Sequence, residues 1–304
     1  MIEKLRYGEN PHQESAVYSF SKNIKIEQLS GKKLSYNNYN DMFSALSISK
    51  TLPTNKGTVI IKHTNPCGVS INKDHLKSYQ YALACDPLSA FGGILSCNYK
   101  VKIKLAKEIN KLFFEVVIAN GFAKDALKIL KSKKNLRIID ARKIKINDIQ
   151  NFITNFNMFL VQNSDTNQFS NKNFKVVSKK KPNSKTLKSL IFAFNICRFV
   201  KSNSIVLVKN DTTVGIGGGQ PSRVDSCQIA INKMNNFQKI SENDEIVAAS
   251  DAFFPFVDGF EKLVQAGVSA IIQPSGSIRD KEIIKFANET KTILVFSKTR
   301  HFRH

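Results

Sequence analysis

Short β-branched runs alternate with amphipathic segments along most of this chain, and that alternation limits the possible folds. Segments with the apolar spacing of a helix separate the runs, for example 76–84 and 257–266. A sheet covered by helices satisfies both periodicities, whereas a helix bundle or a β-sandwich satisfies only one. The sequence therefore predicts an α/β protein. The clearest predicted strands are 58–62, 94–97, 116–119, 204–208, 246–249, 270–272 and 293–296.

One polar stretch divides the chain. Residues 166–186 are rich in Ser, Asn and Lys and contain few apolar side chains. That composition is typical of a linker between folded units. We therefore predict a first subdomain over 1–165 and a second over 187–304. Comparison of residue identities reveals no internal repeat.

The charge is unusual for a chain of 304 residues. Lys and Arg number 46 against 24 Asp and Glu, a net charge of +22. Such an excess raises the alternative of a nucleic-acid-binding protein. Only eight of the basic residues are arginine, the residue that nucleic-acid readers favour, and no helix-turn-helix, RRM or KH signature is present. The sequence therefore disfavours nucleic acid as a partner. A Lys-rich solvated surface or steering of small anions explains the charge equally well.

The sequence gives little indication of a metal site, a disulfide framework or a membrane-spanning helix. The five cysteines form no Cys-x-x-Cys pair, and the five histidines form no His-x-Glu pair. We expect no zinc site, and the odd number of cysteines disfavours a disulfide framework. No apolar run reaches the roughly 18–20 residues of a spanning helix. With no secretory signal at the N-terminus, we expect a cytoplasmic protein without a membrane partner.

Lys62 and His63 follow the predicted strand 58–62 and are the first candidates for chemistry. An imidazole accepts a proton near neutral pH, and an adjacent ammonium stabilises developing negative charge. Asn65, Pro66 and Gly68 predict a turn directly after them. The pair alone is equally compatible with a surface lysine and a turn histidine.

A second candidate is the glycine-rich stretch 215–220, which follows the strand 204–208 and a turn at 210–211. Its spacing matches neither a Rossmann loop nor a P-loop. Glycines here allow a ligand to approach the backbone closely, or they form a tight turn. Three more segments combine aromatic and charged residues, namely 6–13, 250–258 and 300–304.

Together these segments resemble one family, AICAR transformylase, the formyl-transferring part of a bifunctional purine-biosynthesis protein that also carries IMP cyclohydrolase. The similar stretches occur in the family's order and extend over essentially the whole chain. They are LRYGENPHQ (5–13), GKKLSYNNYND (31–41), IKHTNPCGV (61–69), DPLSAFGG (86–93), VKSNSIVLVKN (200–210), VGIGGGQPSRVDS (214–226), SDAFFPFVDG (250–259), PSGSIRD (274–280) and TRHFRH (299–304).

The resemblance implies two cytidine-deaminase-like α/β/α subdomains without a zinc site. It implies transfer of a formyl group from 10-formyltetrahydrofolate to the 5-amino group of AICAR, giving FAICAR and tetrahydrofolate, with no catalytic metal. It also implies a homodimer with sites at the subunit interface, and it allows a structural monovalent cation near residues 200–210. Because only four residues precede LRYGENPHQ, we expect no cyclohydrolase domain in this chain, and a separate IMP cyclohydrolase is one candidate partner.

The resemblance also implies roles for individual residues. His63 would accept the proton, Lys62 would stabilise the transition state, and Asn210 would orient the reacting groups. The residues implied to bind AICAR are Arg6, Tyr7, Asn38, His63, Gly92, Glu115, Asn210, Phe253, Arg300 and Phe302. Those implied to bind the folate are Arg223, Val224, Asp258, Ser277 and Ile278. A catalytically silent scaffold is the other alternative, and the presence of Lys62, His63 and Asn210 argues against it.

Overall fold

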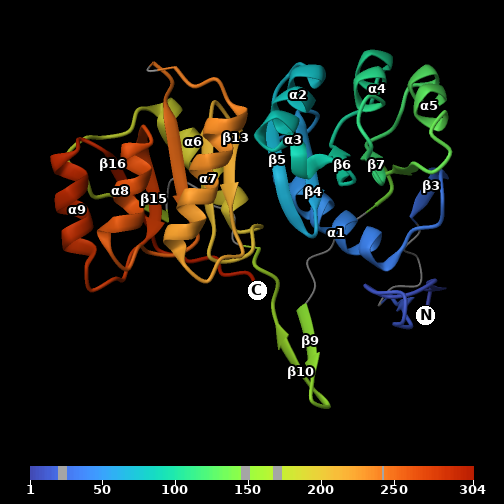
Figure 1. The fold of residues 1–304 in the computed structure, drawn as a ribbon, viewed down its shortest axis with the longest axis horizontal. Helices are drawn as coiled ribbons and strands as arrows, with labels where there is room; N and C mark the ends of the chain where they lie inside the picture. Colours follow the sequence, from blue (N-terminus) through green and yellow to red (C-terminus); the bar gives the residue numbers. More distant parts are fainter. Residues whose placement is uncertain (20–25, 145–150, 167–172, 242) are drawn as a thin grey trace.

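The computed structural model describes residues 1–19, 26–144, 151–166, 173–241 and 243–304. Within these ranges, strands from both ends of the chain join in one 12-stranded mixed sheet (Figure 1). Its strands, in spatial order, are β11 (Phe174–Val176), β16 (Ile293–Ser297), β15 (Val268–Pro274), β14 (Ile246–Ser250), β12 (Ile205–Lys209), β13 (Thr212–Gly217), β5 (Asn65–Ile71), β4 (Gly57–Lys62), β6 (Ile94–Cys97), β7 (Val116–Ala119), β8 (Arg137–Asp140) and β3 (Glu27–Ser30).

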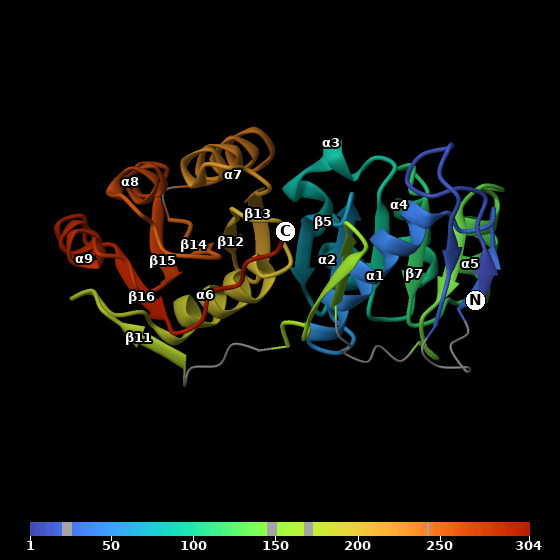
Figure 2. The ribbon, with the colours of Figure 1, turned by 90° about the horizontal axis from the view of Figure 1, so that it is seen from below.

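Helices cover both faces of this sheet, which confirms the predicted α/β class. One face carries α1 (Tyr36–Thr51) and α6 (Ser184–Cys197), whose apolar side chains form a single buried cluster across the whole sheet. The other face has two separate clusters, one for each half of the chain. The helices of that face are α2 (His75–Cys85), α4 (Ile103–Ile109) and α5 (Lys124–Lys131) in the first half, and α7 (Arg223–Phe237), α8 (Val257–Gln265) and α9 (Asp280–Glu289) in the second (Figure 2). A short helix, α3 (Pro87–Ala90), follows α2.

The two halves repeat one topology, although their residue identities do not. Each half runs helix, antiparallel hairpin, helix, and then three parallel strands linked by helices: α1-β4-β5-α2-β6-α4-β7-α5-β8, then α6-β12-β13-α7-β14-α8-β15-α9-β16. An antiparallel strand pairs with the last strand in each half, β3 on β8 and β11 on β16. The two halves share their topology and their pattern of burial, so residue identities alone do not reveal the duplication.

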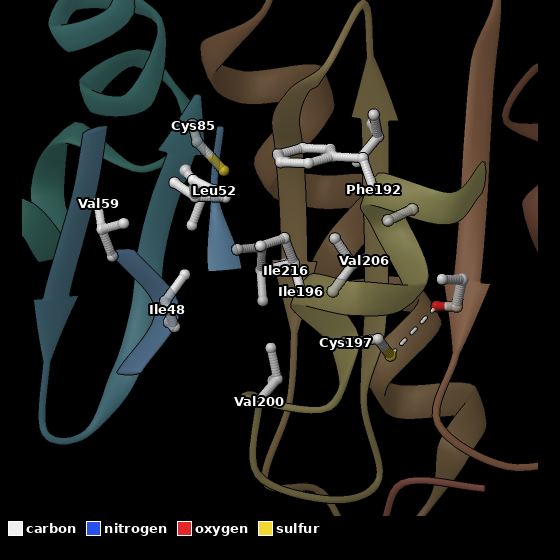
Figure 3. Close-up of a cluster of buried hydrophobic side chains, with 14 of the residues drawn as sticks. Ile48, Leu52, Val59, Cys85, Phe192, Ile196, Cys197, Val200, Val206 and Ile216 are labelled. Carbon is white, nitrogen blue, oxygen red and sulfur yellow. Dashed lines mark hydrogen bonds between the residues drawn. The ribbon is translucent and has the colours of Figure 1, made fainter. Parts of the chain in front are cut away.

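The halves meet at a seam where β5 and β13 run antiparallel. Hydroxyl groups form much of this contact: Val69 N–H donates to Thr213 Oγ1 over 2.9 Å, and Ser70 Oγ lies 2.8 Å from Thr212 Oγ1. Beside the seam, side chains of α1 and α6 pack into the shared cluster, including Ile48, Leu52, Ile196 and Val200 (Figure 3). The sheet is therefore continuous across both halves.

Strands at this seam include residues 65–68 and 215–217, which corrects the predicted turn at Asn65–Gly68 and the first half of the predicted loop at 215–220. Residues 218–220 follow β13 outside the strand. A Cβ atom on Gly68 would lie 1.9 Å from the carbonyl oxygen of Ala82 in α2. On the other side of the seam, one on Gly217 would lie 1.9 Å from the carbonyl oxygen of Ser226 in α7. These glycines permit close packing of helix on strand, and the turn before β5 is made by His63 and Thr64.

The other predicted elements are present, with shifted ends. The largest shift is at α1, which begins at Tyr36 rather than near Asp41 because Ser35 and Asn38 form a capping box. Of the predicted linker, residues 167–172 lie outside the described residues. Phe174–Val176 form an edge strand that pairs with β16. The division into subdomains at 166–186 stays a prediction.

All five cysteines are free and buried. Burial raises the pKa of Cys67, Cys85 and Cys97 to about 12, so these thiols stay protonated at neutral pH. Among the described residues, no helix has both the length and the apolar character needed to cross a membrane.

Replacing Gly68 with alanine tests the close packing at the seam. We expect Gly68→Ala to lower the free energy of unfolding by about 3 kcal/mol, because the new methyl group meets a helix carbonyl that cannot move without displacing α2. Urea denaturation followed by circular dichroism measures this change. Gln80→Ala, on the exposed face of α2, is the control and should change the same quantity by less than about 0.5 kcal/mol. Equal stabilities of the two variants would contradict this account.

Candidate functional site

Strand directions gather most of the predicted site residues at one rim of the sheet. β4 ends here at Lys62, and the register places the starts of β6 and β7 beside it. Because β5 and β13 are antiparallel, the carboxyl ends of β14, β15 and β16 reach this same rim. We call it the His63 rim. It carries the segments that contain Lys62, His63, Gly92, Glu115, Arg223, Phe253, Ser277, Ile278, Arg300 and Phe302.

His63 lies in a two-residue hairpin turn that a half-buried carboxylate supports. His63 and Thr64 have positive φ values of 52° and 62°, and their N–H groups donate to the Asp41 carboxylate over 3.2 and 2.6 Å. Burial raises the pKa of Asp41, while these two N–H donors act in the opposite direction. The imidazole of His63 is exposed. Asp41 therefore fixes the turn and leaves the imidazole available to a ligand.

Lys62 is held against an aromatic surface. Its Nζ donates to the carbonyl oxygen of Phe91 over 2.7 Å. The ring of Phe91 is 56% exposed, and its centroid lies 5.4 Å from that of Phe113. Gly92 follows at a φ of 74°, and its N–H donates to the carbonyl of Phe113. This part of the rim thus has an ammonium held by a backbone carbonyl and two partly exposed aromatic rings close in sequence to it, which suits a planar, anionic ligand.

Glu115 stands at the start of β7 on this rim. Arg137 Nη1 donates to Glu115 Oε2 over 2.5 Å, and the Arg137 side chain is largely buried. The carboxylate of Glu115 remains partly exposed. The pairing with arginine holds this carboxylate in one orientation at the rim.

The N-terminal segment lies against the start of α1. Tyr39 donates from its hydroxyl to Glu3 Oε2 over 3.2 Å, and Asn37 donates to the carbonyl of Glu9. Arg6 Cζ lies 5.6 Å from the ring centroid of Tyr7. Asn38 belongs to the helix cap, since its Oδ1 accepts from Ser35 N–H and its side chain is buried. The amide of Asn38 is therefore an internal group.

Arg223 is also internal. Its guanidinium pairs with Asp251 and donates to Ser250 Oγ over 2.8 Å and to Asn203 Oδ1 over 2.6 Å. Its side chain is 7% exposed. Arg223 thus links the starts of β12 and α7 to the end of β14.

The remaining folate candidates are accessible. Asp258 is exposed in the first turn of α8, and Val224 is half-buried at the start of α7. Ser277 is half-buried and Ile278 is fully exposed in the loop after β15. Nearby, Arg279 Cζ lies 4.9 Å from the ring centroid of the exposed Phe256. This part of the rim presents apolar and aromatic surface beside a carboxylate.

Asn210 is not brought to the His63 rim. It lies in the turn between β12 and β13, and the carbonyl of the next residue, Asp211, accepts from Ile71 N–H at the far end of β5. β5 has seven residues, so this turn is about 20 Å from His63 within one chain. The duplication explains this placement: Lys209-Asn210 occupies in the second half the position of Lys62-His63 in the first, and the antiparallel seam sends the two turns to opposite rims.

Sequence reasoning missed two residues that support the site. Asp41, the last residue of the stretch 31–41, supports the His63 turn. Asn65 accepts from Lys201 N–H over 2.9 Å and donates to the carbonyl of His63, so it ties the turn to the second half. Both residues lie within the stretches already quoted. For Asn65 the available signal was a polar residue shortly after the predicted strand 58–62. No group of three or more potential metal ligands occurs among the residues that the structure describes.

Comparisons with known proteins point to one family. The sequence model of the AICARFT/IMPCHase bienzyme family matches residues 1–233. A bifunctional purine biosynthesis protein PurH from Persephonella marina is 44% identical over 308 residues, which cover 99% of this chain and 59% of the relative. Proteins of the same name from Leptospira biflexa and Bacillus cereus are 43% and 42% identical, again over 99% of this chain and 59% of the relative. The chain thus spans about three fifths of the length of the curated relatives it matches.

The support that Asp41 gives to the turn can be measured as stability. We expect Asp41→Ala to lower the free energy of unfolding by about 1–3 kcal/mol, because two turn N–H groups lose their acceptor. Asp41→Asn keeps an oxygen acceptor and should lose less. Urea denaturation of the three proteins measures the difference. Equal losses for the two variants would show that the acceptor oxygen is not what stabilises the turn.

Proposed function

The chain belongs to the AICARFT/IMPCHase bienzyme family, and from that premise we propose that it transfers a formyl group from 10-formyltetrahydrofolate to the 5-amino group of AICAR. The observation that carries the proposal is the turn of Lys62 and His63, held by Asp41 at the rim where the ligand candidates gather. FAICAR and tetrahydrofolate are the products. The reaction belongs to purine biosynthesis, and we propose a cytoplasmic location for it.

The chemistry asked of His63 is removal of a proton. The aromatic amine of AICAR is a weak nucleophile because its lone pair is delocalised into the imidazole ring. As its nitrogen bonds to the formyl carbon, the exposed imidazole of His63 takes the proton from that nitrogen. The ammonium of Lys62 stabilises the negative charge that develops on the formyl oxygen. The carbon–nitrogen bond to tetrahydrofolate then breaks, and the departing nitrogen takes up a proton.

We divide the rim between the two substrates. The AICAR side comprises Arg6, Tyr7, Gly92, Glu115, Phe253, Arg300 and Phe302, which place guanidinium groups for a phosphate beside aromatic rings for the base. The folate side comprises Val224, Asp258, Ser277 and Ile278, where a carboxylate stands near exposed apolar surface. Asn38 and Arg223 act from inside, by capping α1 and by holding Asn203. The orienting role of Asn210 stays a prediction for a site that a second subunit completes.

The finer features implied by the resemblance remain proposals. We propose that the two repeated halves are cytidine-deaminase-like subdomains, each with a sheet between two helix layers. A monovalent cation near residues 200–210 and a separate IMP cyclohydrolase as partner stay predictions.

A homodimer is supported by a hairpin that projects from the body (Figure 1). β9 (Asn151–Asn155) and β10 (Met158–Gln162) form a two-stranded ribbon separate from the main sheet. Its exposed apolar side chains are Phe152, Ile153, Phe156, Met158, Phe159, Leu160 and Val161. An isolated hairpin with this much exposed apolar surface is unstable in water without a partner. We propose that it packs on a second copy of the chain.

Substitutions at the two equivalent turns test the assignment of the chemistry. We expect His63→Ala to reduce formyl transfer by about 10²–10⁴-fold, since the proton acceptor is lost, and Lys62→Ala to reduce it by about 10²-fold. Asn210→Ala should reduce the rate as well if a second subunit brings its turn to His63, as the resemblance implies. Gln80→Ala, on the exposed face of α2, is the control and should stay within about threefold of the wild type. Tetrahydrofolate release with AICAR and 10-formyltetrahydrofolate measures each rate. A rate for His63→Ala close to that of the wild type would refute the proposed site.

The oligomeric state tests the hairpin. We expect the wild type to sediment as a dimer, and Phe159→Lys combined with Leu160→Lys to shift it to a monomer, because two charges cannot be buried in an apolar contact. Leu88→Lys is the control, since Leu88 is an exposed apolar residue in the first half. Analytical ultracentrifugation at several concentrations gives the result. A hairpin variant that stays dimeric would rule out this interface.

A further inference from the structure

The last residues of the chain alternate between exposed and buried positions. Arg300, Phe302 and His304 are exposed, whereas His301 is 2% exposed and Arg303 is partly buried. Figure 2 shows this segment running from β16 toward the middle of the sheet. The segment therefore has an inner row that anchors it and an outer row that is exposed.

The inner row is attached along its backbone. His301 N–H donates to the Asp251 carbonyl over 3.0 Å, and Ser202 N–H donates to the Arg303 carbonyl over 2.8 Å. The side chain of Arg303 donates to the Phe199 carbonyl over 2.7 Å, and burial lowers the pKa of its guanidinium. These contacts hold the segment to elements of the second half.

The His301 side chain makes a different kind of contact. Its Nδ1 is hydrogen-bonded to Oδ2 of Asp165, a residue distant in the chain that follows the β9–β10 hairpin. On its other side, the ring packs edge-on against Phe194, with centroids 5.1 Å apart. Arg198 Nη1 lies 3.5 Å from the Asp165 carbonyl. The imidazole is thus held between a ring of α6 and the carboxylate of Asp165.

The outer row is an aligned surface. Arg300 Cζ lies 4.7 Å from the ring centroid of Phe302, whose ring lies 5.8 Å from that of His304. Since neighbouring side chains in extended backbone point to opposite sides, fixing His301 fixes the directions of Arg300 and Phe302. A guanidinium stacked on an aromatic ring suits a phosphate-bearing heteroaromatic ligand.

We propose that Asp165 is a positioning residue for AICAR. It touches no substrate, and it acts by holding His301 so that Arg300 and Phe302 keep one orientation at the His63 rim. This inference rests on the proposed function, because it assigns the outer row to AICAR. It adds Asp165, which follows the hairpin in the chain and contacts the C-terminal segment, to the residues on which the affinity for AICAR depends.

Removing the carboxylate tests this role. In Asp165→Ala we expect the KM for AICAR to rise about tenfold with kcat within about twofold, because one ordering hydrogen bond is lost while Lys62 and His63 are untouched. The KM for 10-formyltetrahydrofolate should stay unchanged. Amide hydrogen exchange should accelerate in residues 299–304 without AICAR present. Asp165→Asn keeps an oxygen acceptor and should restore both readouts to within about threefold, and Asp125→Ala, at an exposed carboxylate of α5, should match the wild type.

The outcomes separate this inference from the proposed function. If the wild type transfers no formyl group, the proposed function fails, while the exchange measurement still reports on the contact of Asp165 with His301. If the wild type is active and Asp165→Ala keeps its KM for AICAR, the positioning role is overturned. A fall in kcat accompanied by a matching loss of stability would also overturn it, since that pattern indicates a structural role alone.

Discussion

The antiparallel pairing of β5 with β13 determines the rest of this structure. Threonine and serine hydroxyls form much of the contact between the two strands. Glycines in the same strands leave room for the carbonyl groups of α2 and α7, so these helices lie close to the sheet. Since the two halves have one topology, the direction of this pairing decides which strand ends share a rim. Antiparallel pairing brings the Lys62-His63 turn of the first half together with the carboxyl ends of β14, β15 and β16. A rim with both catalytic and binding candidates follows from that geometry.

The duplication has become asymmetric at the two turns. In the first half, Asp41 accepts from the turn N–H groups, and the turn residue His63 is exposed. In the second half, a salt bridge of 2.6 Å joins Lys209, the counterpart of Lys62, to Asp244. That bonding lowers the pKa of Asp244 to about 2, so this carboxylate is ionised at neutral pH and stands against the lysine side chain. One fold therefore offers an available ammonium and imidazole at one rim and a lysine paired with a carboxylate at the other.

Most elements could be predicted from the sequence, because burial on both faces makes the central strands continuous apolar runs. The position of Gly68 in a strand could not, since its reason is a helix carbonyl that only the tertiary fold brings near. The same holds for the site. Lys62 and His63 follow from chemistry at a strand end, whereas the internal roles of Arg223 and Asn38 depend on partners that local sequence does not reveal. That Asn210 lies at the opposite rim of the same chain could not be predicted either, because it follows from the direction of the seam.

The apolar cluster beneath α1 and α6 has a consequence for synthesis of the chain. That cluster contains side chains from both halves, and β5 finds its second neighbour only when β13 has been made. While the ribosome is still producing the second half, β5 is paired with β4 on one side only, and its other edge is exposed together with part of an unfinished core. Such intermediates pair readily with the wrong chain. Efficient production of this protein therefore depends on how quickly β12 and β13 follow, or on a chaperone that covers β5 in the interval.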